Sequence, residues 1–179
     1  MNALRAGVKT IEHGSYLDEE CAKLMKQKGA IFVATRLIVA GGLEEKELWP
    51  PASYEKLVKI ASYHKKAYAL AVKHEVKIAL GTNQSTCEEG SFNSHGRNGK
   101  ELFYAVEAGL TPLGAIEACT ATSPETLGEH VAPRSGQLIE GFGADLIAVT
   151  GNPLENIKIL ADPANISHVW KAGKLYKSP

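Results

Sequence analysis

Two hydrophobic periods alternate along the first two thirds of the chain. A continuous apolar run at 30–35 is typical of a strand buried on both faces of a parallel sheet, and we predict shorter strands at 8–13 and 76–80. Apolar residues at helical spacing predict helices at 18–28 and from about 53 to 74. Because strands and helices alternate, the pattern predicts an α/β fold with a parallel sheet and crossover helices.

Local start and stop signals refine these boundaries. Ser53 is the predicted N-cap of the long helix, and 41–51, with Gly-Gly and Pro-Pro pairs, is predicted to be a loop. Further helices are predicted at 98–108, from Thr111-Pro112 onward, and at 123–127. The polar stretch 84–97 is predicted to be a loop over one end of the sheet.

The sequence pattern changes from residue 137 onward. Residues 144–150, 166–171 and 174–176 are strand-like and are separated by turns, which indicates a small β unit outside the main body. We therefore expect two domains, 1–136 and 137–179. Three parallel strands would leave two long, apolar, unpaired sheet edges. The chain also opens on what looks like the last turn of a helix closed by Gly7, so we expect that a preceding part is missing.

Charge and composition narrow the possible partners. The 179 residues contain 20 Lys and Arg against 20 Asp and Glu, so the net charge is zero. That balance argues against nucleic acid or an anionic membrane surface as a partner. The three cysteines form no C-x-x-C pair, which favours a reduced compartment. No apolar run reaches membrane-span length and no signal-peptide stretch opens the chain, so a cytoplasmic location is expected.

Two side chains stand where the first and third predicted strands end. His13 closes Thr10-Ile11-Glu12-His13, and Asn83 follows Gly81-Thr82. Active sites of parallel α/β folds lie at this end of the strands, where a neutral imidazole can bind a divalent metal. From composition alone, a histidine hydrogen-bonded at a strand end is the favoured explanation of His13. Asn83 is equally explained as a turn residue, because Asn tolerates unusual backbone angles.

Two further residues are candidates for binding substrate. Arg36 ends the middle predicted strand and could receive a substrate carboxylate in a bidentate pair, or be a surface arginine. His95, on the polar loop, could contact substrate or be an ordinary exposed histidine. Together they would favour a carboxylate-bearing amide, such as an N-acyl amino acid or a dipeptide.

Ordered segments along the whole chain resemble the amidohydrolase superfamily. The similarity is greatest to the branch of imidazolonepropionase-like proteins, Xaa-Pro dipeptidases and ochratoxin-hydrolysing amidases. The matching segments are Ala6–His13, Phe32–Arg36, Ile78–Asn83, Glu107–Pro112, Gly143–Ala148, Gly151–Leu154 and Val169–Lys174. The resemblance implies that the three strands are the sixth to eighth of a (β/α)₈ TIM barrel. It also implies that 137–179 belongs to a small β-sandwich built from both chain ends.

The resemblance also implies roles for particular residues. His13 takes the place of the family's metal-binding histidine on strand six, and Asn83 takes the place of its aspartate on strand eight. In the intact family enzyme two divalent ions, usually zinc, polarise the scissile carbonyl and activate a bridging water, and that aspartate shuttles the proton. The family's other ligands lie upstream of the segment that matches this chain. Asn83 has no anionic form at neutral pH, so it cannot act as that base.

Three hypotheses follow. The chain is a C-terminal fragment of a metal-dependent amidohydrolase acting on non-peptide or dipeptide C–N amide bonds, inactive alone and dependent on a missing N-terminal half. Alternatively, it is a non-catalytic half-barrel association module, forming a homodimer or pairing with a full-length relative. Thirdly, it could be an autonomous hydrolase whose metal site is built from His13, Asn83, His95 and Cys87.

Overall fold

The computed structural model describes residues 1–88, 90–128 and 130–179. Its first sheet holds three parallel strands in the order β1 (Thr10–Glu12), β2 (Ile31–Val33) and β3 (Lys77–Ile78). Ile11 pairs with Phe32, and Phe32 pairs with Ile78. The predicted parallel sheet is confirmed. The strands are shorter than predicted, so the two sheet edges are short rather than long.

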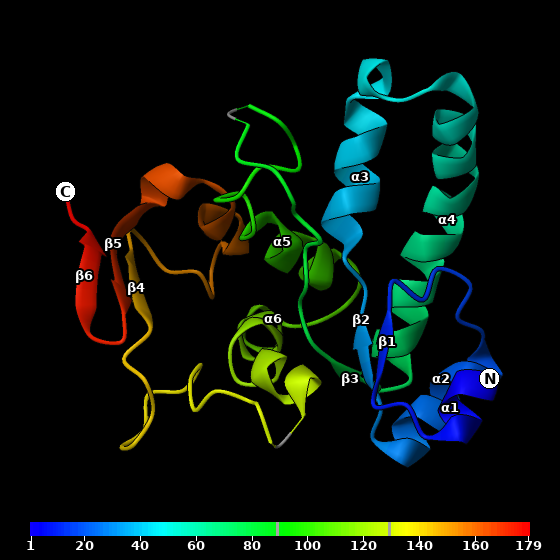
Figure 1. Ribbon diagram of the computed structural model, residues 1–179, viewed down its shortest axis with the longest axis horizontal. Helices are drawn as coiled ribbons and strands as arrows, with labels where there is room; N and C mark the ends of the chain where they lie inside the picture. Colours follow the sequence, from blue (N-terminus) through cyan, green and yellow to red (C-terminus); the bar gives the residue numbers. More distant parts are fainter. Residues whose placement is uncertain (89, 129) are drawn as a thin grey trace.

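Helices connect and cover these strands (Figure 1). Helix α3 stands beyond the strand ends beside the first part of α4, and α4 then continues alongside the sheet to the start of β3; α5 and α6 lie on the other side of the sheet region. The α-helices are α1 (Asn2–Ala6), α2 (Glu19–Lys28), α3 (Arg36–Glu44), α4 (Pro51–Lys73), α5 (Lys100–Glu107) and α6 (Pro112–Cys119). The 3₁₀ helices are η1 (Lys46–Leu48), η2 (Ser123–Leu127), η3 (Ile157–Ala161) and η4 (Pro163–Asn165).

Most helix boundaries follow from local chemistry. The Asp18 carboxylate accepts a hydrogen bond from the Cys21 amide at 2.8 Å at the start of α2. Thr111 caps α6 in the same way, with Pro112 at the first helical position, as predicted. The prediction of Ser53 as the N-cap of α4 was wrong. The helix begins at Pro51, because proline already has a helical φ and needs no amide partner there.

Helix α3 was missed by the sequence analysis, which placed a loop from residue 41. Its two central glycines suggested a turn, but they serve packing instead. A Cβ on Gly41 would lie 2.4 Å from the Phe92 ring, and one on Gly42 would lie 3.0 Å from the Trp49 ring. Two aromatic rings therefore rest directly on the helix backbone. The cost of glycine in a helix, about 1 kcal/mol each, is offset by this close approach.

The core lies between the sheet and its helices. Phe32 is fully buried against Leu4, Met25 and Tyr68 in the main apolar cluster. The neighbouring side chains Ile31 and Val33 point to the opposite face, where they form a second small cluster with Ala79. This alternation, with both faces buried, explains why the sequence of β2 is continuously apolar.

The second sheet is antiparallel and lies at the other end of the molecule, beyond α5 and α6 (Figure 1). It contains β4 (Leu146–Val149), β5 (Ile166–Lys171) and β6 (Lys174–Lys177), in that order. These strands lie where the sequence predicted them. The division into domains 1–136 and 137–179 stays a prediction.

Close contact joins the two regions at one glycine. A Cβ on Gly99, just before α5, would lie 1.7 Å from the Leu160 carbonyl oxygen of η3. Only a residue without a side chain allows α5 and η3 to approach this closely. Among the helices described, none is long and apolar enough to cross a bilayer.

Candidate active site

Three residues that follow the parallel strands share an unusual backbone conformation. His13, Thr35 and Asn83 have φ angles of 61°, 52° and 53°, in the left-handed region. They follow β1, β2 and β3 in turn, so they stand at the carboxyl edge of the sheet. Left-handed backbone at a non-glycine residue costs about 1–3 kcal/mol, and such residues cluster at functional sites. Glu75 and Ala172 are also left-handed, in turns elsewhere, so three of the five such non-glycine residues described follow the parallel strands, two of them the residues that the sequence marked.

His13 and Thr35 are joined by a short hydrogen bond. The Nδ1 atom of His13 lies 2.6 Å from Oγ1 of Thr35, and the Thr35 hydroxyl donates to the Ala34 carbonyl, also at 2.6 Å. Because the hydroxyl is directed at the carbonyl, we assign Oγ1 as the acceptor of the His13 bond and the imidazole proton to Nδ1. The Nε2 lone pair is the one left for a ligand. His13 is exposed, whereas Thr35 is buried.

Asn83 stands on the far side of β2 from His13. Two strand spacings separate the strands that carry them, which is roughly 10 Å. Asn83 is exposed, and the neighbouring Thr82 hydroxyl accepts a hydrogen bond from Asn98 at 3.2 Å. The position suits a group facing the edge of the sheet, but a carboxamide there supplies neither a negative charge nor a base.

The side chain of Arg36 is buried among the helices, and its contact with a substrate stays a prediction. Because α3 begins at Arg36, its side chain turns back among the helices, where Nη1 donates to the Ala61 carbonyl at 3.0 Å. It is 9% exposed and lines a cavity of about 30 Å³ together with Tyr68 and Glu107. Burial lowers the pKa of its guanidinium, and Glu107 partly offsets this. The idea of a carboxylate-bearing substrate loses its main support.

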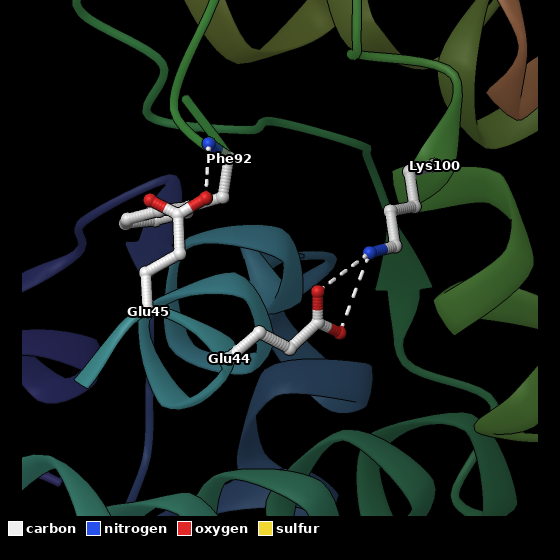
Figure 2. A network of polar contacts seen from close by, with 4 residues as sticks. All are labelled: Glu44, Glu45, Phe92 and Lys100. Atoms are coloured by element: carbon white, nitrogen blue, oxygen red, sulfur yellow. Dashed lines mark hydrogen bonds and ion pairs between the residues drawn. The ribbon is translucent and has the colours of Figure 1, made fainter. Parts of the chain in front are cut away.

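His95 lies on the loop between β3 and α5, exposed and with its amide bonded to the Thr86 carbonyl at 2.9 Å. Figure 2 shows how this loop is fixed: Glu45 accepts a hydrogen bond from the Phe92 amide at 3.0 Å, and Lys100 lies 3.3 Å from Glu44. The loop is thereby docked on the end of α3. Contact between His95 and a substrate stays a prediction.

A complete metal site is not assembled by the residues described. Within 1–88, 90–128 and 130–179 there is no group of three or more His, Cys, Asp or Glu side chains placed to hold an ion. The combination of His13, His95 and Cys87 that an autonomous hydrolase would require is therefore not formed. His13, with Nε2 open, fits the part of a single ligand.

Sequence reasoning missed two buried polar residues behind this edge. Glu101 on α5 and His64 on α4 are each 1% exposed, and both contact the segment that follows β2. Burial raises the pKa of Glu101 to about 8, although two amide donors and Arg36 act in the opposite direction. Burial lowers the pKa of His64 to about 4, so its imidazole is neutral at physiological pH. Their buried positions became apparent only from the fold.

These features define a class of protein: a parallel α/β fold with strained, polar residues gathered at the carboxyl edge of its sheet, where enzymes of this class have their active sites. The family follows from comparison with known sequences. The Amidohydrolase family model matches residues 1–176, and the chain belongs to that family. The family generally uses divalent metals. A histidine at the carboxyl edge of the sheet, such as His13, is compatible with the hydrolase chemistry of the family.

Individual relatives agree with this assignment. Over its whole length the chain is 46% identical to ochratoxinase from Aspergillus niger, and it spans about a third (36%) of that protein. The crystal structure of A. niger ochratoxinase superposes with a TM-score of 0.82, covering 99% of this chain and 38% of that one. A Xaa-Pro dipeptidase with methionine in its active site gives 0.81 at 33% identity, covering 98% of this chain and 41% of that one.

Proposed function

We propose that the chain is the C-terminal portion of a metal-dependent amidohydrolase that hydrolyses amide C–N bonds of small molecules, and that it is inactive alone. In this proposal β1 to β3 are the last three strands of a (β/α)₈ barrel, and β4 to β6 are part of a small composite sandwich. The observation that carries the proposal is the pairing of His13 and Thr35, which leaves one imidazole nitrogen open at the carboxyl edge of the sheet.

The proposal that the chain is inactive alone rests on its incomplete set of metal ligands. A catalytic zinc needs about three protein ligands, and this edge supplies one histidine and one carboxamide. The chain also spans only about a third of the curated relatives that it matches. The relatives are longer than this chain. The remaining ligands would come from barrel strands in the part of the relatives that this chain does not match. The named activities of the relatives, an ochratoxinase and a Xaa-Pro dipeptidase, favour an amide or dipeptide substrate.

Metal content gives a direct test. Purified chain, dialysed against zinc and analysed by elemental mass spectrometry, is expected to hold no stoichiometric ion. A chimera that joins it to the unmatched part of A. niger ochratoxinase is expected to bind zinc, and His13→Ala should reduce the amount bound. His130→Ala, at a histidine outside the sheet edge, is the matched control. A chimera that folds but binds zinc equally well with and without His13 would refute the proposal.

A second candidate function is favoured by Asn83. A half-barrel with a carboxamide in place of the family's aspartate could serve as a non-catalytic association module, forming a homodimer or pairing with a full-length relative. Light scattering after size exclusion distinguishes the two. A stable dimer of the chain, together with a chimera that binds no zinc, would favour the association module. A cytoplasmic location belongs to the proposal and can be tested by cell fractionation.

A further inference from the structure

Buried groups on two helices hold the segment that follows β2. Glu101, on α5, spans the first turn of α3: its Oε1 accepts from the Arg36 amide at 2.8 Å and its Oε2 from the Leu37 amide at 2.6 Å. These are amides of the first helical turn, which have no partner within their own helix. A carboxyl group from another helix therefore provides the cap that Thr35, the N-cap residue, does not provide through its side chain.

The other side of the segment is held by α4. His64 Nε2 lies 2.7 Å from the Ala34 carbonyl oxygen, and since a carbonyl only accepts, His64 donates this bond. The same oxygen also accepts from the Thr35 hydroxyl. The side chain of Arg36 adds a bond from Nη1 to the Ala61 carbonyl on α4. Each residue flanking Thr35 is thus tied to α4 or α5.

Thr35 lies between these anchors in a conformation that β-branched residues rarely adopt. With its φ at 52° it is strained, and it would relax toward extended backbone if its neighbours were free. Relaxation would rotate its hydroxyl away from His13. The short His13–Thr35 bond therefore depends on groups that touch neither His13 nor the edge of the sheet.

We propose that Glu101 and His64 are positioning residues that keep Thr35 left-handed, so that its hydroxyl fixes the His13 imidazole with Nε2 open at the sheet edge. The inference deepens the proposed function and rests on it only for what Nε2 would bind. It assigns a purpose to a buried carboxyl group that has no part in the site itself. The conformation of His13 is set by residues on α4 and α5, 51 and 88 positions later in the chain.

The imidazole tautomer of His13 is the readout, since loss of stability alone would not change it. Long-range ¹H–¹⁵N spectra of the whole chain, at a pH where histidine is neutral, distinguish Nδ1–H from Nε2–H, and His13→Ala identifies the signals. In the unmodified chain the Nδ1–H form is expected to be favoured about tenfold, the factor that one net hydrogen bond gives. Thr35→Val should abolish this bias and Thr35→Ser should keep it.

Glu101→Gln tests the anchor itself above pH 8, the approximate pKa of Glu101, where both carboxylate oxygens accept. The substitution keeps the shape but turns one acceptor into a donor facing a backbone amide. The preference of His13 for the Nδ1–H tautomer is expected to be lost, which leaves a mixture of the two tautomers. Glu107→Gln, on the same helix in an exposed pair with Lys65, is the control and should leave the bias unchanged. His64→Leu is expected to act like Glu101→Gln.

Two results would overturn the inference. One is the finding that His13 carries its proton on Nε2 in the unmodified chain. This measurement does not depend on whether any variant folds. The other is a folded Glu101→Gln chain with the tautomer ratio of the unmodified protein. If the variant does not fold, amide exchange in the unmodified chain decides: protected Arg36 and Leu37 amides support the anchor, and freely exchanging ones refute it. No metal enters these measurements, so they can fail while zinc binding by the chimera succeeds, or the reverse.

Discussion

The Oε2 atom of Glu101 lies 2.6 Å from the backbone nitrogen of Leu37, a residue 64 positions earlier in the chain. The bond joins the start of α5 to the start of α3 through a carboxyl group that is 1% exposed. Charged hydrogen bonds of this kind are short and strong, but removing the carboxylate from water opposes them. Desolvation dominates here, which raises the pKa of Glu101 to about 8. Glu101 should therefore make the free energy of unfolding depend on pH.

Ionisation of Glu101 should destabilise the folded chain as the pH rises. Since the pKa of Glu101 is about 8 in the folded chain and 4.5 is its ordinary value, the folded state binds more protons between these pH values. The free energy of unfolding should fall as the pH rises through this window, by at most about 1.4 kcal/mol per pH unit, relative to Glu101→Gln. Urea titrations at pH 5, 6.5 and 8 provide the measurement. A constant difference between the two proteins would contradict the raised pKa.

His64 should act in the opposite direction. Its pKa is about 4 in the folded chain against 6.5 ordinarily, so the unfolded state takes up the proton first as the pH falls. The free energy of unfolding should therefore decrease from pH 6.5 toward 4, by up to about 3 kcal/mol, relative to His64→Gln. Above pH 7 this contribution should be constant. His130→Gln serves as the control, and an equal pH dependence in both variants would argue against a buried neutral His64.

The elements that could be predicted from sequence are those with local signals. Asp18 and Thr111 cap their helices by contacts within three residues, and the apolar run around Phe32 sets the middle strand. Helix α3 escaped prediction because Gly41 and Gly42 are explained only by aromatic rings that arrive from other parts of the chain. Local propensity was overridden there by tertiary packing.

The candidate site divides in the same way. His13 and Asn83 were found because strand ends can be read from the sequence. Arg36 was misplaced because the start of α3 was not recognised, and that start turns its side chain away from the edge. Glu101 carries no local signal at all. A glutamate in the first turn of a helix is ordinary, and the amides that it caps belong to a different helix.

A substitution at Gly99 should separate α5 from η3. The Cβ of Gly99→Ala would lie 1.7 Å from the Leu160 carbonyl, which is backbone and cannot rotate away. Unfolding in urea should show a loss of about 1–3 kcal/mol or more. Gly143→Ala is the matched control, because its nearest atom would lie at 3.5 Å and it should change stability by less than about 1 kcal/mol. Equal effects of both would mean that the contact is not tight.

The loop that carries His95 offers a local test (Figure 2). Glu45→Ala removes the acceptor of the Phe92 amide, so hydrogen exchange at that amide should accelerate about tenfold, as expected for one lost hydrogen bond. Glu44→Ala removes only an exposed ion pair with Lys100, worth at most about 1 kcal/mol, and should leave that exchange unchanged. Fast exchange at Phe92 in the unmodified chain would mean that the loop is not docked.

The left-handed backbone at His13, Thr35 and Asn83 has a consequence for the rate of assembly. The contacts that flank Thr35 come from other helices of the same chain, so the energetic cost of shaping this part of the edge is met when the chain folds. Surfaces that need no reshaping associate at rates set by encounter and orientation. The step that completes this edge should therefore speed up in proportion to partner concentration, with no plateau from a slow internal rearrangement.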